Sequence, residues 1–292
     1  MKRLVKKSLM LLAGVLMLAS ACNKLPVSEE TGIATGKGTV VLKLTDAPFP
    51  VSLVDKALVT IDKIEIRSAA PVSATEEEDN NEALYTVIST KTQEFNLLDL
   101  QNGITATLIE INIPVGSYDL IRMHVVAANI ILKDGKEFPM KIPGGSESGL
   151  KLKLNPVLVV ASGVAHEVLL DFNVSKSFIT QGNMKSKNGI KGFIFKPVIR
   201  AVVEKHSGRV RGKVFENEKT PIVEAHVQIL SGTEVLSSAL TDKEGEYAII
   251  GVPPGEYTMV CEKDGYTKVT IEKVIVKEKE NTTENFKMVK PI

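Results

Sequence analysis

Apolar and polar residues alternate with a period of two along much of the chain from residue 38 onward. In the first half, this alternation defines segments at 38–45, 58–66, 109–113, 118–131, 150–154, 168–174 and 193–203. A period of two is typical of strands with one buried face. No segment keeps a period of 3.6 over three turns, and the polar segment 175–189 has room for one helical turn at most. The pattern therefore predicts a mostly β region.

Three local signals refine the predicted strands. The apolar phase slips by one residue between Ile61 and Ile64, which predicts a β-bulge near Asp62-Lys63. Asp134-Gly135 stands between two apolar runs and predicts a two-residue hairpin. Pro197 places the segment 193–203 at a sheet edge or at a bulge, because proline cannot donate a ladder hydrogen bond.

A second series of strand-length segments follows, from about residue 207 to residue 289. Its turn signals, such as Glu244-Gly245 and Pro253-Pro254-Gly255, lie about ten residues apart, which is the spacing of a seven-strand sandwich. Only Glu204 to Gly208 separates the two series, which predicts a semi-rigid joint. We therefore predict an all-β fold with two antiparallel β-sandwich domains in tandem, at 38–204 and 207–289.

One short motif occurs in both halves. Pro114-Val115-Gly116-Ser117-Tyr118 and Pro253-Pro254-Gly255-Glu256-Tyr257 share Pro-x-Gly-x-Tyr before an alternating segment. Proline and glycine set the turn locally, and the tyrosine can pack its ring and bond its hydroxyl at the sheet edge. We interpret the shared motif as turn chemistry and not as a proven duplication.

The first two dozen residues have a different pattern. Lys2, Arg3, Lys6 and Lys7 precede an uncharged run from Ser8 to Leu18. The run is about half of the roughly 20 residues that a membrane-spanning helix needs, so it indicates a secretory signal. It ends in Leu18-Ala19-Ser20-Ala21-Cys22.

This ending resembles the lipobox of bacterial lipoproteins. The resemblance implies a signal peptide at 1–21 and lipidation of Cys22, which would become the new N-terminus. Two or more acyl chains hold a soluble domain stably on a bilayer. The polar residues at 22–37 would then be a tether. The alternative is an ordinary secretory signal with an incidental cysteine.

Charge and cysteine content narrow the function. Removal of 21 residues from the 292-residue chain leaves 271 residues, with 32 Lys and Arg against 35 Asp and Glu, a net charge of −3. This charge argues against a nucleic-acid partner, because nucleic-acid binders are basic. If Cys22 is lipidated, only Cys261 remains, so no intramolecular disulfide can form.

The second half resembles a known family. The motifs that carry the resemblance are Thr241-Asp242-Lys243-Glu244-Gly245-Glu246-Tyr247, Gly251-Val252-Pro253-Pro254-Gly255-Glu256-Tyr257 and Asp264-Gly265-Tyr266. They are similar to the carboxypeptidase regulatory-like domain over about residues 207–289. The resemblance implies a transthyretin-like sandwich of the carbohydrate-binding-like superfamily. It does not imply peptidase activity, because the catalytic domain that accompanies such modules is absent.

The first half, residues 36–203, resembles a bacterial lipoprotein domain of unknown function. The motifs are Leu44-Thr45-Asp46-Ala47-Pro48, Asn96-Leu97-Leu98-Asp99-Leu100-Gln101-Asn102-Gly103, Pro114-Val115-Gly116-Ser117-Tyr118, Ile121-Arg122 and Lys196-Pro197-Val198-Ile199-Arg200. This resemblance supplies a name and a location but no mechanism.

Residues with site-forming chemistry are interpreted as structural. Asp46 is expected to start a turn, and Asp242, Glu244 and Glu246 are expected to form a hairpin turn with solvated acids in place of a calcium loop. A calcium-binding role for the acidic segment 69–83 is the minor alternative. Cys261 is expected in the core. Four histidines are the candidates for a zinc site or a catalytic triad, but they lie far apart in sequence: His124, His166, His206 and His226. Three tyrosines are the candidates for an aromatic sugar-binding platform, but they occupy positions of the family's structural tyrosines: Tyr247, Tyr257 and Tyr266.

We therefore predict no catalytic, cofactor-binding or metal-binding residues, and Cys22 as the one modified site. The leading hypothesis is a non-enzymatic, lipid-anchored binding or adhesion module of the outer membrane, on its periplasmic or cell-surface face. Its partner would be a glycan or another envelope protein. The alternative is an accessory carbohydrate-binding subunit of a polysaccharide-handling system, and the third hypothesis is an unrecognised enzyme.

Overall fold

The computed structural model describes residues 36–47, 53–69, 82–140, 142, 148–183, 189–217 and 220–291. They belong to one compact unit, Ala34–Ile292. The predicted signal peptide, the predicted tether to residue 35 and most of the acidic segment 69–83 lie outside the described residues.

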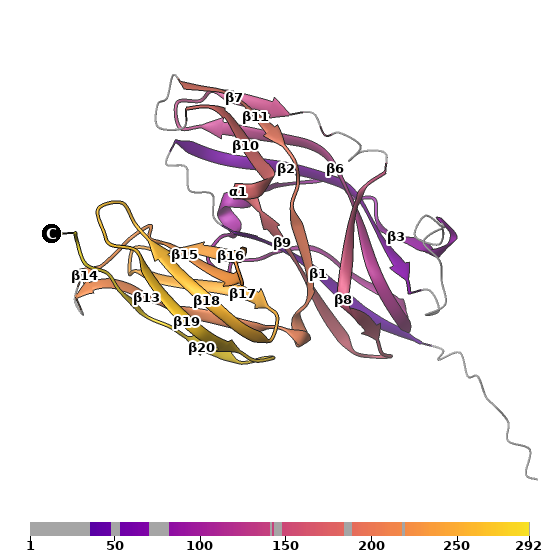
Figure 1. Cartoon of the computed structure of the whole chain (residues 1–292). Helices are drawn as coiled ribbons and strands as arrows, with labels where there is room; N and C mark the ends of the chain where they lie inside the picture. The colour runs from indigo at the N-terminus through magenta and orange to yellow at the C-terminus, as the bar shows by residue number, and fades with distance from the viewer. Residues whose placement is uncertain are drawn as a thin grey trace, which may run out of the picture. The chain divides into compact units, whose positions relative to one another are not determined.

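The first part of this unit, residues 36–206, is called the N-terminal sandwich here (Figure 1). Its elements are β1 (Lys37–Ala47), β2 (Val54–Ser68), η2 (Glu82–Leu84), β3 (Tyr85–Ser89), β4 (Gln93–Asn96), η3 (Leu97–Leu100), β5 (Ala106–Pro114), β6 (Gly116–Leu132), β7 (Glu137–Met140), β8 (Leu150–Val160), β9 (Ala165–Asn173), α1 (Val174–Ser177), β10 (Phe178–Gly182), β11 (Ile190–Phe195), β12 (Ile199–Val203) and η5 (Glu204–His206).

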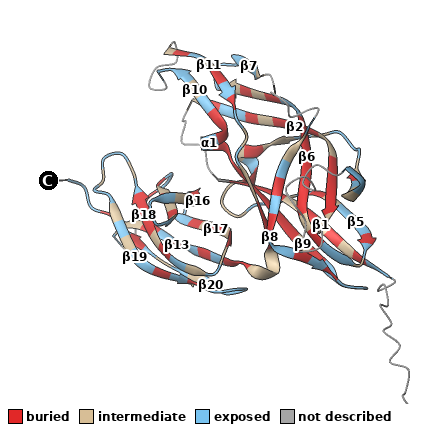
Figure 2. Cartoon of the chain, turned by 45° about the vertical axis from the view of Figure 1, so that its right-hand side comes forward, coloured by how far each residue is buried: buried red, intermediate tan, exposed pale blue. Residues whose placement is uncertain are grey.

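Strands of the N-terminal sandwich form one hydrogen-bonded path, β3-β2-β6-β8-β12-β9-β1-β5, with β4 and β7 attached to β2 and β6. The path folds over on itself, because one buried core contains residues from both ends, such as Ile64 and Met123 from one and Leu42 and Phe172 from the other. Figure 2 shows these buried positions recurring along β1, β6 and β9. The alternation of the sequence thus marks the face that points into the core.

Two local predictions are confirmed. In the pairing of β2 with β6, Ile61 lies opposite Val125 and Lys63 opposite His124, which leaves Asp62 as the extra residue of a bulge. The predicted hairpin at Asp134-Gly135 joins the antiparallel strands β6 and β7, but its loop has three residues, 133–135, and not two, since the Leu132 N–H donates to the Lys136 carbonyl.

Two predictions for the end of this sandwich are wrong in detail. The segment 193–203 is not one strand: it divides into β11 and β12, which lie in different sheets, and Pro197 is in the gap between them. The polar segment 175–189 has its single helical turn in α1, but it also contributes β10, which pairs with β11. Proline lacks the amide donor needed to continue the ladder, so the chain changes sheets there.

The C-terminal sandwich, residues 208–291, has two sheets. Its strands are β13 (Gly208–Asn217), β14 (Thr220–Pro221), β15 (His226–Ser231), β16 (Glu234–Leu240), β17 (Glu246–Val252), β18 (Gly255–Glu262), β19 (Val269–Val276), β20 (Asn281–Thr283) and β21 (Phe286–Lys287). One sheet has the order β16-β15-β18-β19, and the other joins β14, β13 and β17 with β20 and β21. Val214, Val227, Met259 and Phe286 pack in a separate core.

The all-β tandem prediction is confirmed, and most strand pairs are antiparallel as expected. Among the described residues, four pairs are parallel: β1 with β9, β8 with β12, and β13 with β20 and with β21. Parallel neighbours require a long connection. The whole of β2 to β8 lies between β1 and β9 in the chain, so their pairing has no local sequence signal.

The shared Pro-x-Gly-x-Tyr motif makes the same bond in both sandwiches. The Tyr118 hydroxyl donates to the Pro114 carbonyl at 2.9 Å, and the Tyr257 hydroxyl donates to the Pro253 carbonyl at 2.8 Å. Each bond closes the turn that precedes a strand. The predicted turn chemistry is therefore confirmed at the level of the hydrogen bond.

Candidate functional site: a polar pocket at the joint of the two sandwiches

Hydrogen bonds tie the two sandwiches together within their common unit. Asn102 follows η3 of the N-terminal sandwich in the left-handed conformation, with φ of 59°. Its side-chain oxygen accepts a 2.5 Å hydrogen bond from the backbone N–H of Ala248, in β17. Since β17 is an edge strand, the Ala248 N–H would otherwise have no partner strand to bond, and the Asn102 side chain supplies the acceptor.

Further contacts join β9 and β12 to the C-terminal sandwich. The Ser237 hydroxyl donates to the Asp171 carboxylate, which also pairs with Arg200 at 2.6 Å. The buried side chains of Leu169 and Val202 lie against Gly251, where an added Cβ would meet Leu169 at 2.7 Å. The joint is therefore both apolar and hydrogen-bonded.

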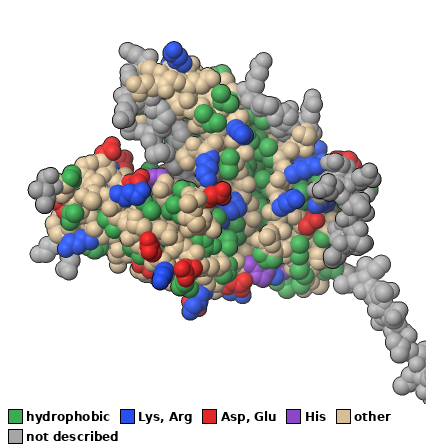
Figure 3. Space-filling view, in the orientation of Figure 1, with side chains coloured by type: hydrophobic (Ala, Val, Ile, Leu, Met, Phe, Trp, Pro, Cys, Tyr) green, Lys and Arg blue, Asp and Glu red, His purple; other side chains and the backbone are tan. Residues whose placement is uncertain are grey.

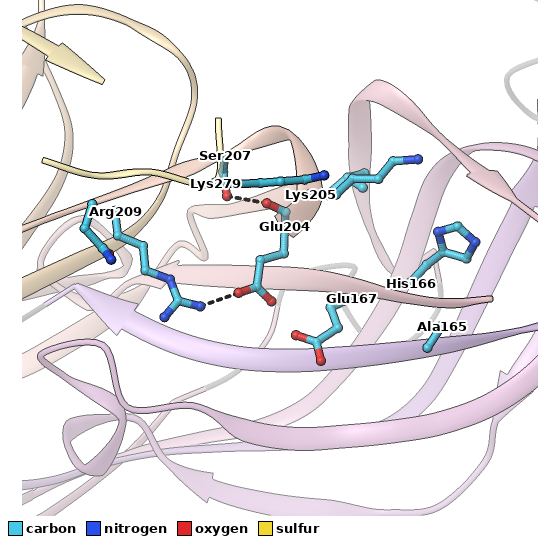
Figure 4. A pocket seen from close by; sticks show the side chains of 10 residues that line it. Ala165, His166, Glu167, Glu204, Lys205, Ser207, Arg209 and Lys279 are labelled. Carbon is cyan, nitrogen blue, oxygen red and sulfur yellow. Dashed lines mark hydrogen bonds and ion pairs between the residues drawn. The ribbon is translucent and has the colours of Figure 1, made fainter. Parts of the chain in front are cut away.

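A pocket of about 400 Å³ lies at this joint, with walls from both sandwiches. We call it the joint pocket. Its lining residues are Ala165, His166, Glu167, Val203, Glu204, Lys205, Ser207, Arg209, Lys279 and Asn281. Figure 4 shows the polar side chains of β9, η5, β13 and the Lys279 turn converging on it. A volume in this range is typical of small-molecule sites.

Two carboxyl groups lie side by side in the joint pocket (Figure 4). Glu204 lies beside Glu167, and each pairs with a cation: Glu167 with Lys43 and Glu204 with Arg209, both at 2.5 Å. The neighbouring Glu167 carboxyl and burial raise the pKa of Glu204, while Glu204 and Lys43 lower the pKa of Glu167. Of the two acids, Glu204 therefore holds a proton more readily.

His166 supplies a neutral donor to the same pocket. Its Nε2 accepts a hydrogen bond from the backbone N–H of Ala161 at 3.2 Å, so the ring proton is on Nδ1. Burial and the charge of Lys205 lower the pKa of His166, which keeps the imidazole uncharged at neutral pH.

A second concavity, of about 600 Å³, lies over β13 and β17, but its charges balance. Of its charged lining residues, Lys213 pairs with Glu246 at 2.7 Å, and Asp242 accepts hydrogen bonds from two backbone N–H groups. Arg211 supplies the fourth charge. Figure 3 likewise shows positive and negative side chains interspersed over the face in view. The joint pocket differs because its cations outnumber its acids.

A buried charged network lies on the outer face of β2 and β6, away from the joint pocket. Glu65 accepts hydrogen bonds from Arg122 Nε at 2.6 Å and His124 Nε2 at 2.8 Å. The Arg122 guanidinium also forms a two-bond pair with Glu82 and stacks over the Tyr85 ring at 3.9 Å. Because each charged group here has a partner, the network stabilises the sandwich and leaves no group directed at a ligand.

The candidate acids of the sequence have structural roles. Asp46 is buried and accepts a hydrogen bond at 3.2 Å from the backbone N–H of Val174, the first residue of α1, while the residues after Ala47, where the expected turn would lie, are outside the described residues. Asp242 does form the predicted hairpin turn, in which its carboxylate accepts from Glu244 and Glu246 N–H. Within the described ranges, no group of three or more His, Cys, Asp or Glu side chains is placed to hold a metal ion.

The tyrosines and Cys261 are also structural. Tyr247 donates to the Glu284 carbonyl at 2.7 Å, and Tyr266 donates to Glu216 at 3.3 Å. Cys261 is fully buried, lies 3.5 Å from the Met288 sulfur, and has its pKa raised to about 12 by burial. The interpretation of Cys261 as a core residue is confirmed.

The four histidines occupy different settings. His124 belongs to the buried network and His166 to the joint pocket, while His206 in η5 faces Glu278 at 3.1 Å. His226 lies in β15, where burial lowers its pKa. The structure thus gives each histidine its own role.

Cys22, the predicted lipidation site, lies outside the described residues. Among the residues described, the structure contains no helix with the length and apolar character to span a membrane.

Apart from His166, the lining residues of the joint pocket were not predicted from the sequence. Glu167, Glu204 and Arg209 read as ordinary charged positions on strands or in a linker. The one available signal was the shortness of the linker between the two strand series, since a short linker forces the last strand of one domain and the first strand of the next to meet. The alternation of apolar and polar residues shows on which side of its own strand a side chain lies. It does not show which part of another domain covers that side.

Comparison with solved structures finds only distant likenesses. The chain matches the TIE protein of Bacillus anthracis with 13% identity, a TM-score of 0.25 and coverage of 87% of this chain and 34% of that one. It matches the minor pilin of Streptococcus agalactiae with 10% identity, a TM-score of 0.24 and coverage of 86% and 96%. The shaft pilin SpaA of Lactobacillus rhamnosus GG gives 11% identity, a TM-score of 0.20 and coverage of 87% and 100%. The chain spans about a third of the TIE protein, and TM-scores this low carry no argument.

Family models give a firmer result. No curated protein matches the chain. The model of the carboxypeptidase regulatory-like domain matches residues 209–289. The model described as a domain of unknown function, DUF4382, matches residues 37–197, more than half of the chain. The chain therefore belongs to the DUF4382 family and has a carboxypeptidase regulatory-like domain after its DUF4382 domain.

Proposed function

We propose that the protein is a lipid-anchored binding module of the bacterial outer membrane that recognises its partner by surface contact, without catalysis. The joint pocket is the observation that carries this proposal. It is an open, polar concavity of ligand size that requires both domains, since its walls come from β9 and η5 on one side and from β13 and β20 on the other. Of the two matched families, one is described as a regulatory-like domain and the other as a domain of unknown function.

The anchor is the first part to test. Fatty-acid label is expected to enter the wild-type protein and to be lost in Cys22→Ser, which should also move from the membrane to the soluble fraction. Cys261→Ser is the matched control, because Cys261 is the other cysteine of the chain and is buried in the core. A Cys22→Ser protein that still takes the label would rule out the anchor.

Partner binding is the second part. The purified full chain, in detergent, is incubated with polysaccharide and protein fractions of the producing bacterium's envelope. We expect saturable binding to one fraction with no change in the composition of that fraction. Turnover of a fraction that one His or Asp substitution abolishes would instead indicate an enzyme.

A carbohydrate-binding subunit of a polysaccharide-handling system is the second candidate. The pocket's hydrogen-bonding side chains, Ser207, Asn281 and His166, favour it, because sugar hydroxyls need both donors and acceptors. Clean binding to one glycan class on an array would favour this candidate over a protein partner.

A further inference from the structure

The joint pocket differs in charge from the concavity over β13 and β17. Its two acids are each paired with a cation, Glu167 with Lys43 and Glu204 with Arg209. Among the described residues, Lys205 and Lys279 have no hydrogen-bonded or ion-paired partner for their ammonium groups. Both ammonium groups are therefore available to a ligand.

Two acids flank Lys279 in sequence, but neither is among the residues that line the pocket. Glu278 faces His206 at 3.1 Å, and Glu280 pairs with Lys277 at 3.7 Å. Counting Lys43 with the lining residues, the pocket has four cations and two carboxyl groups, a net charge of +2 with both acids ionised. A concavity of one sign concentrates ligands of the opposite sign.

The remaining lining groups suit a hydroxylated ligand. Asn281 contributes an amide with two donors and an acceptor. The Ser207 hydroxyl donates to the Glu204 backbone carbonyl at 2.9 Å, so its oxygen can serve a ligand as an acceptor. Asn281 lies directly opposite Arg209 in the pairing of β20 with β13, so both project from neighbouring strands at one level. Among the described residues that line the pocket there is no Phe, Tyr or Trp, the side chains on which a neutral sugar would stack.

We propose that the joint pocket binds an anionic saccharide whose carboxylates pair with Lys205, Lys279 and Arg209 and whose hydroxyls bond to Asn281 and Ser207. Arg209 uses its Nη2 for Glu204, which leaves other N–H donors of the guanidinium for the ligand. The inference rests on the proposed function and adds the ligand's chemical class. A volume of about 400 Å³ limits the bound part to a few sugar units at most.

Calorimetric titration of the full chain in detergent tests the proposal with three probes: trigalacturonic acid, the neutral maltotriose and inorganic phosphate. We expect binding of trigalacturonic acid that weakens with added salt, and at least about tenfold weaker binding of the other two. Equal binding of trigalacturonic acid and maltotriose would overturn the role of charge. Phosphate binding as tight as that of trigalacturonic acid would overturn the assignment to a sugar.

Variants locate the binding. The double variant Lys205→Gln with Lys279→Gln is expected to bind trigalacturonic acid about tenfold more weakly. Lys133→Gln with Lys191→Gln is the matched control, because both lysines are exposed and lie outside the pocket, and it should bind as the native chain does. Equal affinity of the two double variants would overturn the proposal. If the pocket variant still binds its envelope fraction, the binding function stands and only the pocket assignment fails.

Discussion

The Arg122→Met variant is expected to have a free energy of unfolding about 3 kcal/mol below that of the native chain. Methionine retains much of the apolar bulk of arginine but removes the guanidinium, which leaves the Glu65 carboxylate buried without its main partner. The side chains of Glu65 and Arg122 are only 6% and 8% exposed, so water cannot replace the lost pair. Urea denaturation, which does not add salt, measures the change.

The matched control is Arg209→Met, which breaks the pair with Glu204 on a side chain that is 56% exposed. Solvent screens such a pair, so its loss should cost no more than about 1 kcal/mol. If the two variants lose the same stability, the ion pairs around Glu65 are not shielded from solvent, contrary to what the low exposure of Glu65 and Arg122 indicates.

Acid gives an independent measure of the same network. Burial alone would raise the pKa of Glu65, but the hydrogen bonds from Arg122 and His124 and the charges of Arg122 and Lys63 outweigh it and lower the pKa to about 2. A lowered pKa stabilises the fold above the ordinary value of 4.5, and this stabilisation is lost as the pH falls toward 2. The difference in melting temperature between the native chain and Glu65→Gln should therefore narrow across this range.

Strand periodicity predicted the position of Glu65 but not its environment. The alternation of Lys63, Glu65 and Arg67 with Ile64 and Ile66 indicates a strand with one polar, solvated face. The structure confirms the strand and places the isoleucines in the core. Its polar face is nevertheless buried at Glu65 and Arg67. Periodicity reports only two faces of one strand, and a side chain that covers the face from elsewhere leaves no trace in that period.

The joint pocket escaped prediction for the same reason. Asn102 was recognised only as part of a family motif, although its side-chain oxygen accepts a hydrogen bond from the Ala248 N–H on the edge strand β17. The Pro-x-Gly-x-Tyr turns and the Asp62 bulge were predictable because each depends on residues close in sequence. The pocket depends on β9 and β13 meeting across a joint, so its residues are local to no single segment.

The largest effect of a single methyl group is expected at Gly212, in the middle of β13. A Cβ at this position would lie 1.6 Å from the carbonyl oxygen of Glu284, where backbone cannot yield as a flexible side chain does. The same oxygen accepts a hydrogen bond from the Tyr247 hydroxyl at 2.7 Å, and the Glu284 N–H donates to the backbone carbonyl of Arg211. We expect Gly212→Ala to lower the free energy of unfolding by about 3 kcal/mol, because the methyl must push the Glu284 segment off β13.

Gly192→Ala is the control that separates this clash from the general effect of adding a methyl to a strand glycine. Its Cβ would meet only the side-chain oxygen of Gln181, at 3.0 Å, and that side chain can rotate away. Its stability should therefore stay within about 0.5 kcal/mol of the native chain. Since the Glu284 segment follows Asn281, loosening it should also disturb one wall of the joint pocket. Gly212→Ala should thus weaken the binding of trigalacturonic acid, while Gly192→Ala leaves it unchanged. If both variants are as stable as the native chain, Glu284 does not lie against β13 as described.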